Sequence, residues 1–213
     1  MIAAVVFDLD GVVVDSEQLW DEVRAQLVDD WGGCYSQEAQ RAMMGMSSKE
    51  WSAYLADDLG VPRTAEQVNA DIVELMAASY REHLPLIPGA VEAVERLAAV
   101  FTLGVASSSN RELIDLVLEL SGLGRHFRAT VSSEEVPRGK PAPDVYLEAA
   151  RRLGVDPARC AAVEDSASGI ASAHAAGMRL IAYPNRHYPP PYDALALADQ
   201  LLGGLEELLT NAR

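Results

Sequence analysis

The chain has 213 residues and a net charge of −15, from 17 basic and 32 acidic side chains, and 49% of its residues are hydrophobic. A nucleic-acid partner needs a basic surface, so this charge argues against one. No segment reaches the roughly 18 uncharged apolar residues of a membrane span, and no basic region precedes the first apolar run. We therefore expect neither a membrane partner nor a signal peptide. Two cysteines without CxxC spacing, Cys34 and Cys160, predict free, buried thiols in a reducing cytoplasm.

The N-terminal stretch "AAVVFDLDG" (residues 3–11) predicts a buried strand that ends in acidic residues. Side chains two residues apart in an extended segment face the same way, so Asp8 and Asp10 should project toward one site. Crowded like charges repel each other, and a divalent cation is the group that would stabilise them. Gly11 frees the backbone so that the chain can leave the strand sharply.

Residues 16–84 predict an all-helical block of about four helices. Ser16 can cap the first helix, and "SSKE" (47–50) and "TAEQ" (64–67) both fit a capping box. We expect the tryptophans and methionines of this block to form its core or its contact with the sheet, with one or two facing a substrate: Trp20, Trp31, Trp51, Met43, Met44 and Met46.

Beyond "PLIPG" (85–89), helical and strand-like patterns alternate. The predicted helices cover 90–99, 110–121, 142–153 and 167–176, and the predicted strands cover 101–107, 129–132, 160–165 and 179–183. Such alternation predicts an α/β fold with a parallel sheet covered on both faces. We therefore expect a Rossmann-like, doubly wound core formed by residues 1–15 and 85–213, with residues 16–84 inserted as a helical cap domain.

Polar clusters follow several of the predicted strands. The first strand ends at "DLDG", the second at Ser107-Ser108-Ser109-Asn110 and another at Glu164-Asp165-Ser166, while "RGKPAPD" places Lys140 in a proline-containing turn before a helix. Ligands of an open parallel sheet bind beyond the carboxyl ends of its strands, so these clusters should share one edge.

The residue types at this edge suit a metal ion and a phosphate. Mg²⁺ prefers oxygen ligands and binds through one or two carboxylates together with substrate phosphate, which Asp8 and Asp165 could provide, with Glu164 close by. Ser107 and the helix-opening amides after it offer hydrogen bonds to a phosphate. Lys140 offers a compact positive charge for a transferring phosphoryl group.

These clusters resemble, in order, the four motifs of the haloacid dehalogenase-like superfamily of phosphotransferases. The matching segments are "DLDGV", Ser107 in "GVASSS", Lys140 in "GKPAPD" and Glu164-Asp165 in "VEDSASG", and the match spans residues 1 to about 185. The helical block resembles the small cap shared by sugar-phosphate phosphatases, phosphoglycolate phosphatases and β-phosphoglucomutases.

The resemblance implies a role for each motif residue. Asp8 would be the nucleophile that forms an aspartyl-phosphate, and Asp10 would be the general acid and base, whose carbonyl oxygen also binds Mg²⁺. Asp165 would complete the metal site, with Glu164 as a direct or an indirect ligand. Phosphate and substrate contacts are expected from Gly11, Ser107, Ser108, Ser109, Asn110, Lys140 and Lys49.

The predicted function is that of a cytoplasmic, Mg²⁺-dependent phosphatase that acts on a small phosphorylated metabolite such as a sugar phosphate, as a monomer or weak homodimer. Asp10 favours phosphate-ester chemistry, because dehalogenases lack an acid at this position. A β-phosphoglucomutase-like phosphomutase is the first alternative, but Trp20 stands where mutases carry a histidine, and only Lys49 lies near their basic cap residues. A non-catalytic binding module is the second, and the intact motifs argue against it.

Overall fold

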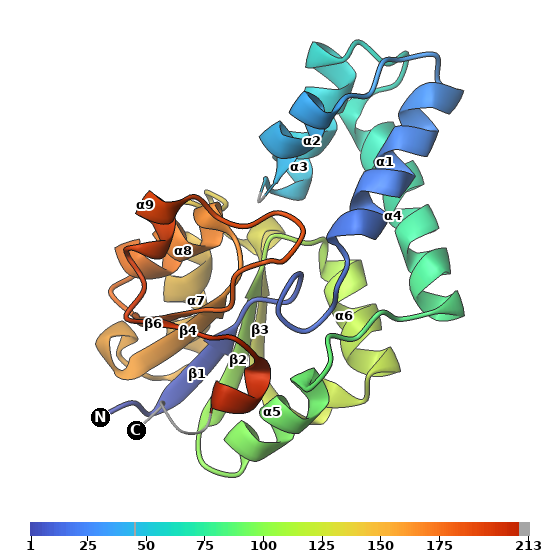
Figure 1. The fold of residues 1–213 in the computed structure, drawn as a ribbon. Helices are drawn as coiled ribbons and strands as arrows, with labels where there is room; N and C mark the ends of the chain where they lie inside the picture. Colours follow the sequence, from blue (N-terminus) through green and yellow to red (C-terminus); the bar gives the residue numbers. More distant parts are fainter. Residues whose placement is uncertain (45, 209–213) are drawn as a thin grey trace.

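The computed structural model describes residues 1–44 and 46–208. Its centre is a six-stranded sheet in which all pairs are parallel, in the order β3-β2-β1-β4-β5-β6 (Figure 1). The strands are β1 (Ala4–Phe7), β2 (Thr102–Ser107), β3 (Phe127–Ser132), β4 (Cys160–Glu164), β5 (Arg179–Ala182) and β6 (Gln200–Leu201). This is the strand order of a Rossmann-like fold, and it confirms the predicted α/β class.

Helices cover both faces of the sheet (Figure 1). One face packs against α5 (Ala90–Ala98) and α6 (Arg111–Leu120), and the other against α7 (Asp144–Leu153), α8 (Ala167–Ala175) and α9 (Tyr192–Leu195). Alternation along β1 produces this division, since Val5 and Phe7 belong to one apolar cluster and Ala4 and Val6 to the other. Short 3₁₀ helices are η2 (Leu123–His126), η3 (Ser133–Glu135), η4 (Pro157–Arg159) and η5 (Leu205–Glu207).

Four helices between β1 and α5 form a separate group above the carboxyl edge of the sheet, coloured blue to cyan-green in Figure 1. They are α1 (Glu17–Asp30), α2 (Gln37–Met43), α3 (Ser48–Ala53) and α4 (Ala65–Glu82), and one turn of π-helix, η1 (Tyr54–Asp58), follows α3. The number of helices agrees with the sequence pattern. We call this group the cap, and its domain boundaries at residues 16 and 84 stay a prediction.

Local side-chain contacts explain where two cap helices begin. The Glu50 carboxylate accepts a hydrogen bond from the Ser47 amide at 2.8 Å, and Thr64 Oγ1 accepts one from the Gln67 amide at 3.3 Å. Ser16 precedes α1 but does not cap it through its side chain, because its backbone is in the helical region (φ −100°, ψ −14°) and not in the extended one that a capping residue needs. Its hydroxyl donates to Asp10 Oδ1 at 2.6 Å.

The remaining differences from prediction concern small features. Cys160 is buried as expected, whereas Cys34 is exposed because it lies in the surface loop between α1 and α2. The sequence pattern also missed α9 and β6, which are too short to show periodicity. No helix in the described part of the chain is both long and apolar enough to cross a membrane.

Candidate active site

The neighbouring strands β1 and β4 bring three acidic side chains together at the carboxyl edge of the sheet. Phe7 pairs with Val163, so Asp8, which follows β1, lies level with Glu164, the last residue of β4, and Asp165 comes directly after it. One carboxylate oxygen from each of these three residues lies within 4.8 Å of the others, and all three residues are buried. This pair of strands is the switch point of the strand order, where ligands bind in open α/β sheets.

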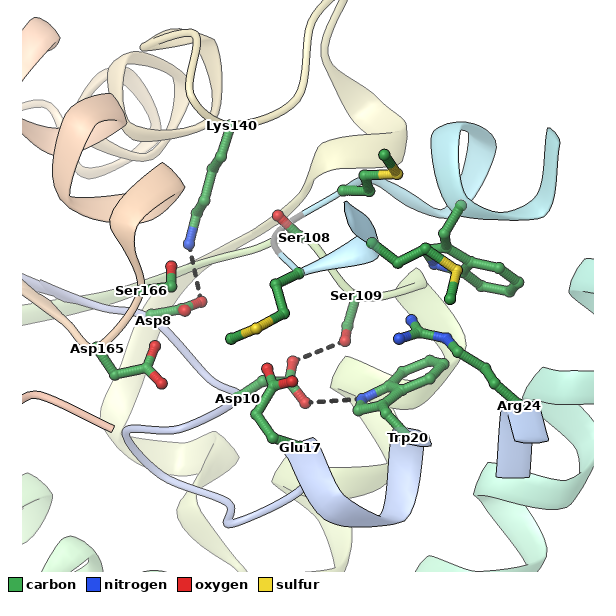
Figure 2. Close-up of a pocket in the computed structure, with 14 residues that line it drawn as sticks. Asp8, Asp10, Glu17, Trp20, Arg24, Ser108, Ser109, Lys140, Asp165 and Ser166 are labelled. Atoms are coloured by element: carbon green, nitrogen blue, oxygen red, sulfur yellow. Dashed lines mark hydrogen bonds and ion pairs between the residues drawn. The ribbon is translucent and has the colours of Figure 1, made fainter. Parts of the chain in front are cut away.

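Lys140 reaches this acidic cluster from the turn before α7. Its ammonium nitrogen lies 2.9 Å from Asp8 Oδ1 (Figure 2) and 2.5 Å from Glu164 Oε1, and the side chain is buried. Burial by itself lowers the pKa of Lys140, but Asp8 and Glu164 more than offset this and raise the pKa above its ordinary value. Lys140 is therefore charged at neutral pH.

The cluster contains three carboxyl groups and only one ammonium group, so negative charge is in excess. Burial, followed by repulsion from Glu164, raises the pKa of Asp8 well above its ordinary value, and Lys140 offsets this in part. Burial, then Glu164 and Asp8, also raise the pKa of Asp165. A bound cation would remove the repulsion, so the electrostatics favour a metal ion here.

The carboxylate of Glu164 is almost fully occupied by hydrogen bonds. Oε1 accepts from Lys140 and from the Tyr146 hydroxyl at 2.7 Å, while Oε2 accepts from the Asp165 amide at 3.0 Å and from Ser166. Gly169 leaves the space for it, since a Cβ there would lie 1.9 Å from Glu164 Oε1. This geometry suits a residue that orients Lys140 better than it suits a direct metal ligand.

Asp8 and Asp165, in contrast, have oxygen atoms that suit a metal ion. Asp8 Oδ1 is buried and makes no hydrogen bond to any described residue, apart from its ion pair with Lys140. Asp165 Oδ2 accepts a hydrogen bond from Asn185 Nδ2 at 3.0 Å, which fixes its side chain. Gly11 has φ of +78°, and a Cβ there would lie 1.8 Å from Asp165 Oδ2, so only glycine allows this approach. A hard cation such as Mg²⁺ fits these oxygen donors.

The Asp10 carboxylate is held by four donors. Ser16 Oγ at 2.6 Å and Trp20 Nε1 at 3.3 Å donate to Oδ1, while Ser109 Oγ at 2.7 Å and Ser107 Oγ at 3.4 Å donate to Oδ2. Trp20 belongs to cap helix α1, Ser107 is the last residue of β2 and Ser109 follows that strand, so Asp10 joins the cap to the sheet. Figure 2 shows the contacts of Asp10 with Trp20 and Ser109. The position of Asp10 therefore depends on where the cap lies.

A cavity of about 50 Å³ lies between the cap and this edge of the sheet. The predicted residues that line it are Asp8, Asp10, Ser108, Ser109, Lys140 and Asp165. Ordinary ligand pockets hold roughly 300–1,000 Å³. In this arrangement of the cap the cavity is therefore smaller than an ordinary ligand pocket.

Other predicted site residues lie outside the cavity lining. Ser107 is fully buried and accepts a hydrogen bond from the Ser109 amide at 3.0 Å, and Gly11 packs against Asp165. Asn110 donates to Asn69 of α4 and to Glu134, so it links the core to the cap. Lys49 is exposed and lines a different hollow, beside Ser48 and Glu134.

The cap contributes more of the lining than the sequence pattern predicted. Five of the six aromatic and methionine residues expected mainly in the cap core line the cavity: Trp20, Met43, Met44, Met46 and Trp51. Ser166 of the polar cluster after β4 lines it as well, and so do Glu17 and Arg24, which the sequence pattern did not indicate. Arg24 lies four residues after Trp20 and four before Val28, on the buried face of α1, and a charge on such a face was the available signal.

Hydrogen bonds hold the cap against the core near the cavity. Glu134 of the core accepts from Ser48 Oγ of α3 at 2.9 Å, and Gln18 of α1 contacts His187 at 3.0 Å on the opposite side. These contacts join the two parts on both sides of the cavity, so the structure represents a closed arrangement of the cap.

Comparison with known proteins agrees with this geometry. Residues 2–177 match the family model of the haloacid dehalogenase-like hydrolases. The chain belongs to this family. It is 34% identical to hexitol phosphatase B of Escherichia coli K12 over 215 residues, which cover 97% of this chain and 94% of that protein. It is 32% identical to a phosphorylated carbohydrates phosphatase of Thermotoga maritima, across 84% of this chain and 83% of that protein.

The fold comparison leads to the same family. The structure of CbbY from Rhodobacter sphaeroides in complex with phosphate superimposes with a TM-score of 0.86 at 27% identity, covering 98% of this chain and 96% of that one. The resemblance inferred from the four motifs is thereby confirmed, and so is the fold of the core.

Proposed function

We propose that this protein is a Mg²⁺-dependent phosphatase that hydrolyses a small phosphorylated metabolite, such as a sugar phosphate, through an aspartyl-phosphate at Asp8. The observation that carries the proposal is the position of the buried Lys140 ammonium, 2.9 Å from Asp8, in a cluster with Asp165 and Glu164. A nucleophilic carboxylate, a phosphoryl-binding cation and an oxygen-rich metal site then occupy one cavity. Relatives named as phosphatases support the same reaction.

Asp8, Asp165 and the carbonyl oxygen of Asp10 would hold the Mg²⁺ ion, which supplies positive charge to the phosphoryl oxygens when it is bound. Lys140 supplies a second positive charge. Ser108 and Ser109 line the cavity and are the best-placed hydroxyls for the phosphoryl oxygens. Ser107 helps to position Ser109, because its hydroxyl oxygen accepts a hydrogen bond from the Ser109 amide.

The reaction would proceed in two displacements at phosphorus. In the first, a carboxylate oxygen of Asp8 attacks, the bond to the leaving oxygen breaks, and Asp10 transfers its proton to that oxygen. In the second, Asp10 accepts a proton from a water molecule, whose oxygen attacks the aspartyl-phosphate. This step releases inorganic phosphate and restores Asp8.

We extend the proposal to the domain organisation, the compartment and the oligomeric state. Residues 16–84 would act as a cap domain over the core of residues 1–15 and 85–213, closing on the substrate and excluding bulk water. We place the protein in the cytoplasm, as a monomer or weak homodimer.

A phosphomutase would need to return phosphate to a sugar phosphate, and Trp20 occupies the position where that branch carries a histidine. A binding module would not need Asp8 and Asp10 together.

Incubation with hexitol and hexose phosphates in the presence of Mg²⁺ tests the proposal. We expect free inorganic phosphate, complete loss of the reaction on chelation, and no reaction with the Asp8→Asn variant. Isomerised sugar phosphate without phosphate release would identify a mutase instead. Turnover that survives exhaustive chelation would contradict the metal requirement.

A further inference from the structure

Arg24 of α1 is a buried cation whose contacts in the described part of the chain are mainly with aromatic rings. Its side chain lines the active-site cavity, and the residue is only 8% exposed. Its Nε atom is buried without a hydrogen bond, and no ion pair joins its guanidinium group to any carboxylate in the described part of the chain. The guanidinium carbon instead lies 4.7 Å from the ring centroid of Trp20 and 5.2 Å from that of Trp51.

This arrangement differs from that of an ordinary buried arginine. Buried charges in proteins are almost always paired with an opposite charge, because an unpaired charge costs several kcal/mol. Burial lowers the pKa of Arg24, while Tyr35, Glu17 and Asp10 offset this in part, and a guanidinium group stays protonated in proteins. Arg24 therefore retains a full charge and free N–H donors inside the cavity.

The position of Arg24 in the cavity indicates what these donors are for. Figure 2 shows its guanidinium group pointing into the cavity, on the side opposite Lys140 and Asp8. The two tryptophan rings hold the group, which limits its rotation. A planar guanidinium held in this way presents paired donors that match the geometry of a carboxylate or a phosphate.

We propose that Arg24 binds a second anionic group of the substrate, a carboxylate or a phosphate, at the end remote from the phosphoryl group that is transferred to Asp8. The inference rests on the proposed phosphatase function and narrows its substrate class. The substrate is then a metabolite with two anionic groups rather than a neutral polyol or sugar monophosphate. Arg24 acts as a specificity-determining residue through its contact with the second group.

Substrates of equal carbon length separate these classes. We would compare kcat/KM for a hexitol 6-phosphate, a 6-phosphohexonate with a terminal carboxylate, and a hexose 1,6-bisphosphate, with p-nitrophenyl phosphate as the general test of phosphatase activity. The wild-type protein should favour at least one doubly anionic substrate over the hexitol phosphate by roughly 10- to 100-fold, the range of a charge-assisted hydrogen bond. A preference for the 6-phosphohexonate would identify the second group as a carboxylate, and a preference for the hexose 1,6-bisphosphate would identify it as a phosphate.

Arg24→Gln should abolish this preference, mainly by raising KM for the doubly anionic substrates. Arg63→Gln is the matched control, because Arg63 also stacks on a cap tryptophan, 5.5 Å from the ring of Trp31, but lies outside the cavity. It should keep the wild-type preference. Arg24→Lys keeps the charge without the paired donors and should give an intermediate preference.

Binding without turnover separates this inference from the proposed function. In the Asp8→Asn background, quenching of tryptophan fluorescence should report tighter binding of a doubly anionic ligand, and Arg24→Gln should remove the difference. Equal wild-type binding and turnover for all three substrates would overturn the inference, whether or not Arg24→Gln folds. A protein that binds doubly anionic ligands more tightly but releases no phosphate from any ester would overturn the phosphatase proposal alone.

Discussion

The Lys140 ammonium nitrogen lies 2.9 Å from Asp8 Oδ1, and both side chains are buried at the carboxyl edge of the sheet. In this position one lysine separates the proposed nucleophile from Glu164 and offsets the negative charge of the cluster. Without Lys140, three buried carboxylates would face one another with no compensating charge. The contact therefore has consequences for stability as well as for catalysis.

Lys140→Met should abolish turnover and lower the free energy of unfolding by about 3–5 kcal/mol, the range observed when one partner of a buried ion pair is removed. Added Mg²⁺ should restore part of that stability, because the cation binds the same carboxylates in the folded state. Urea unfolding with and without Mg²⁺ measures both effects. Lys49→Met is the matched control, since Lys49 is exposed and should change stability by no more than about 0.5 kcal/mol. Equal losses in the two variants would refute the role of the ion pair.

Asp10→Asn should lower kcat/KM for a sugar phosphate by at least roughly 10²-fold, because it removes the general acid and base. The loss in the first step should be smaller for p-nitrophenyl phosphate, whose leaving group departs without a proton. The burst of leaving group, p-nitrophenol or free sugar, in rapid-quench experiments with the two substrates measures this difference. Asp15→Asn changes an exposed neighbour and should have little effect. A loss that is the same for both leaving groups would argue against proton transfer by Asp10.

The hydrogen bonds around Glu164 and Asp165, at the carboxyl end of β4, predict different effects of the two residues on metal binding. Asp165→Asn should raise the Mg²⁺ concentration for half-maximal activity by at least about tenfold. Glu164→Gln should raise it less and should act mainly on kcat, because Glu164 orients Lys140. Activity titrations with Mg²⁺ compare the variants. The reverse order would mean that Glu164, and not Asp165, is the direct ligand.

Glu17 gives a prediction for the pH dependence of stability. Burial, and then repulsion from Asp10, raise its pKa from an ordinary 4.5 to about 7, while Arg24 partly offsets this and Asp15 and Asp21 add to it. The folded state therefore holds this proton more tightly than the unfolded chain, so its contribution to stability is complete below pH 4.5 and is lost as the pH rises to about 7.

The glutamine side chain in the Glu17→Gln variant cannot ionise, so it makes no pH-dependent contribution to stability. The free energy of unfolding of the wild type, relative to the variant, should therefore fall between pH 5 and pH 8. Urea unfolding at several pH values measures the difference, and contributions from histidines cancel because both proteins contain them. A difference that does not change with pH would show that Glu17 titrates normally.

Much of the active-site edge could be predicted from the sequence, because it depends on local rules. Period-two alternation along the first strand and the common edge of parallel strands were enough to place Asp8 beside Asp165. Capping boxes marked the starts of α3 and α4 in the same way. Each of these signals lies within a few residues of the feature that it predicts.

The features that were missed depend on how the cap rests on the sheet. The hydroxyl of Ser16 bonds to Asp10 instead of capping α1, and Arg24 is buried against Trp20 and Trp51; neither contact follows from helical periodicity. Asn185, which fixes Asp165, follows the carboxyl end of β5, so the edge rule applied to that strand would have found it.

Asp8 is the proposed nucleophile of a metal-dependent phosphatase, and every other proposed role in the site follows from this one. The decisive measurement is the rate of phosphate release from a phosphorylated metabolite by the wild-type and Asp8→Asn proteins, each with and without Mg²⁺. We predict release only by the wild type with Mg²⁺, while both proteins give the same circular dichroism spectrum. Phosphate release by a folded Asp8→Asn protein at a rate close to that of the wild type would contradict the account.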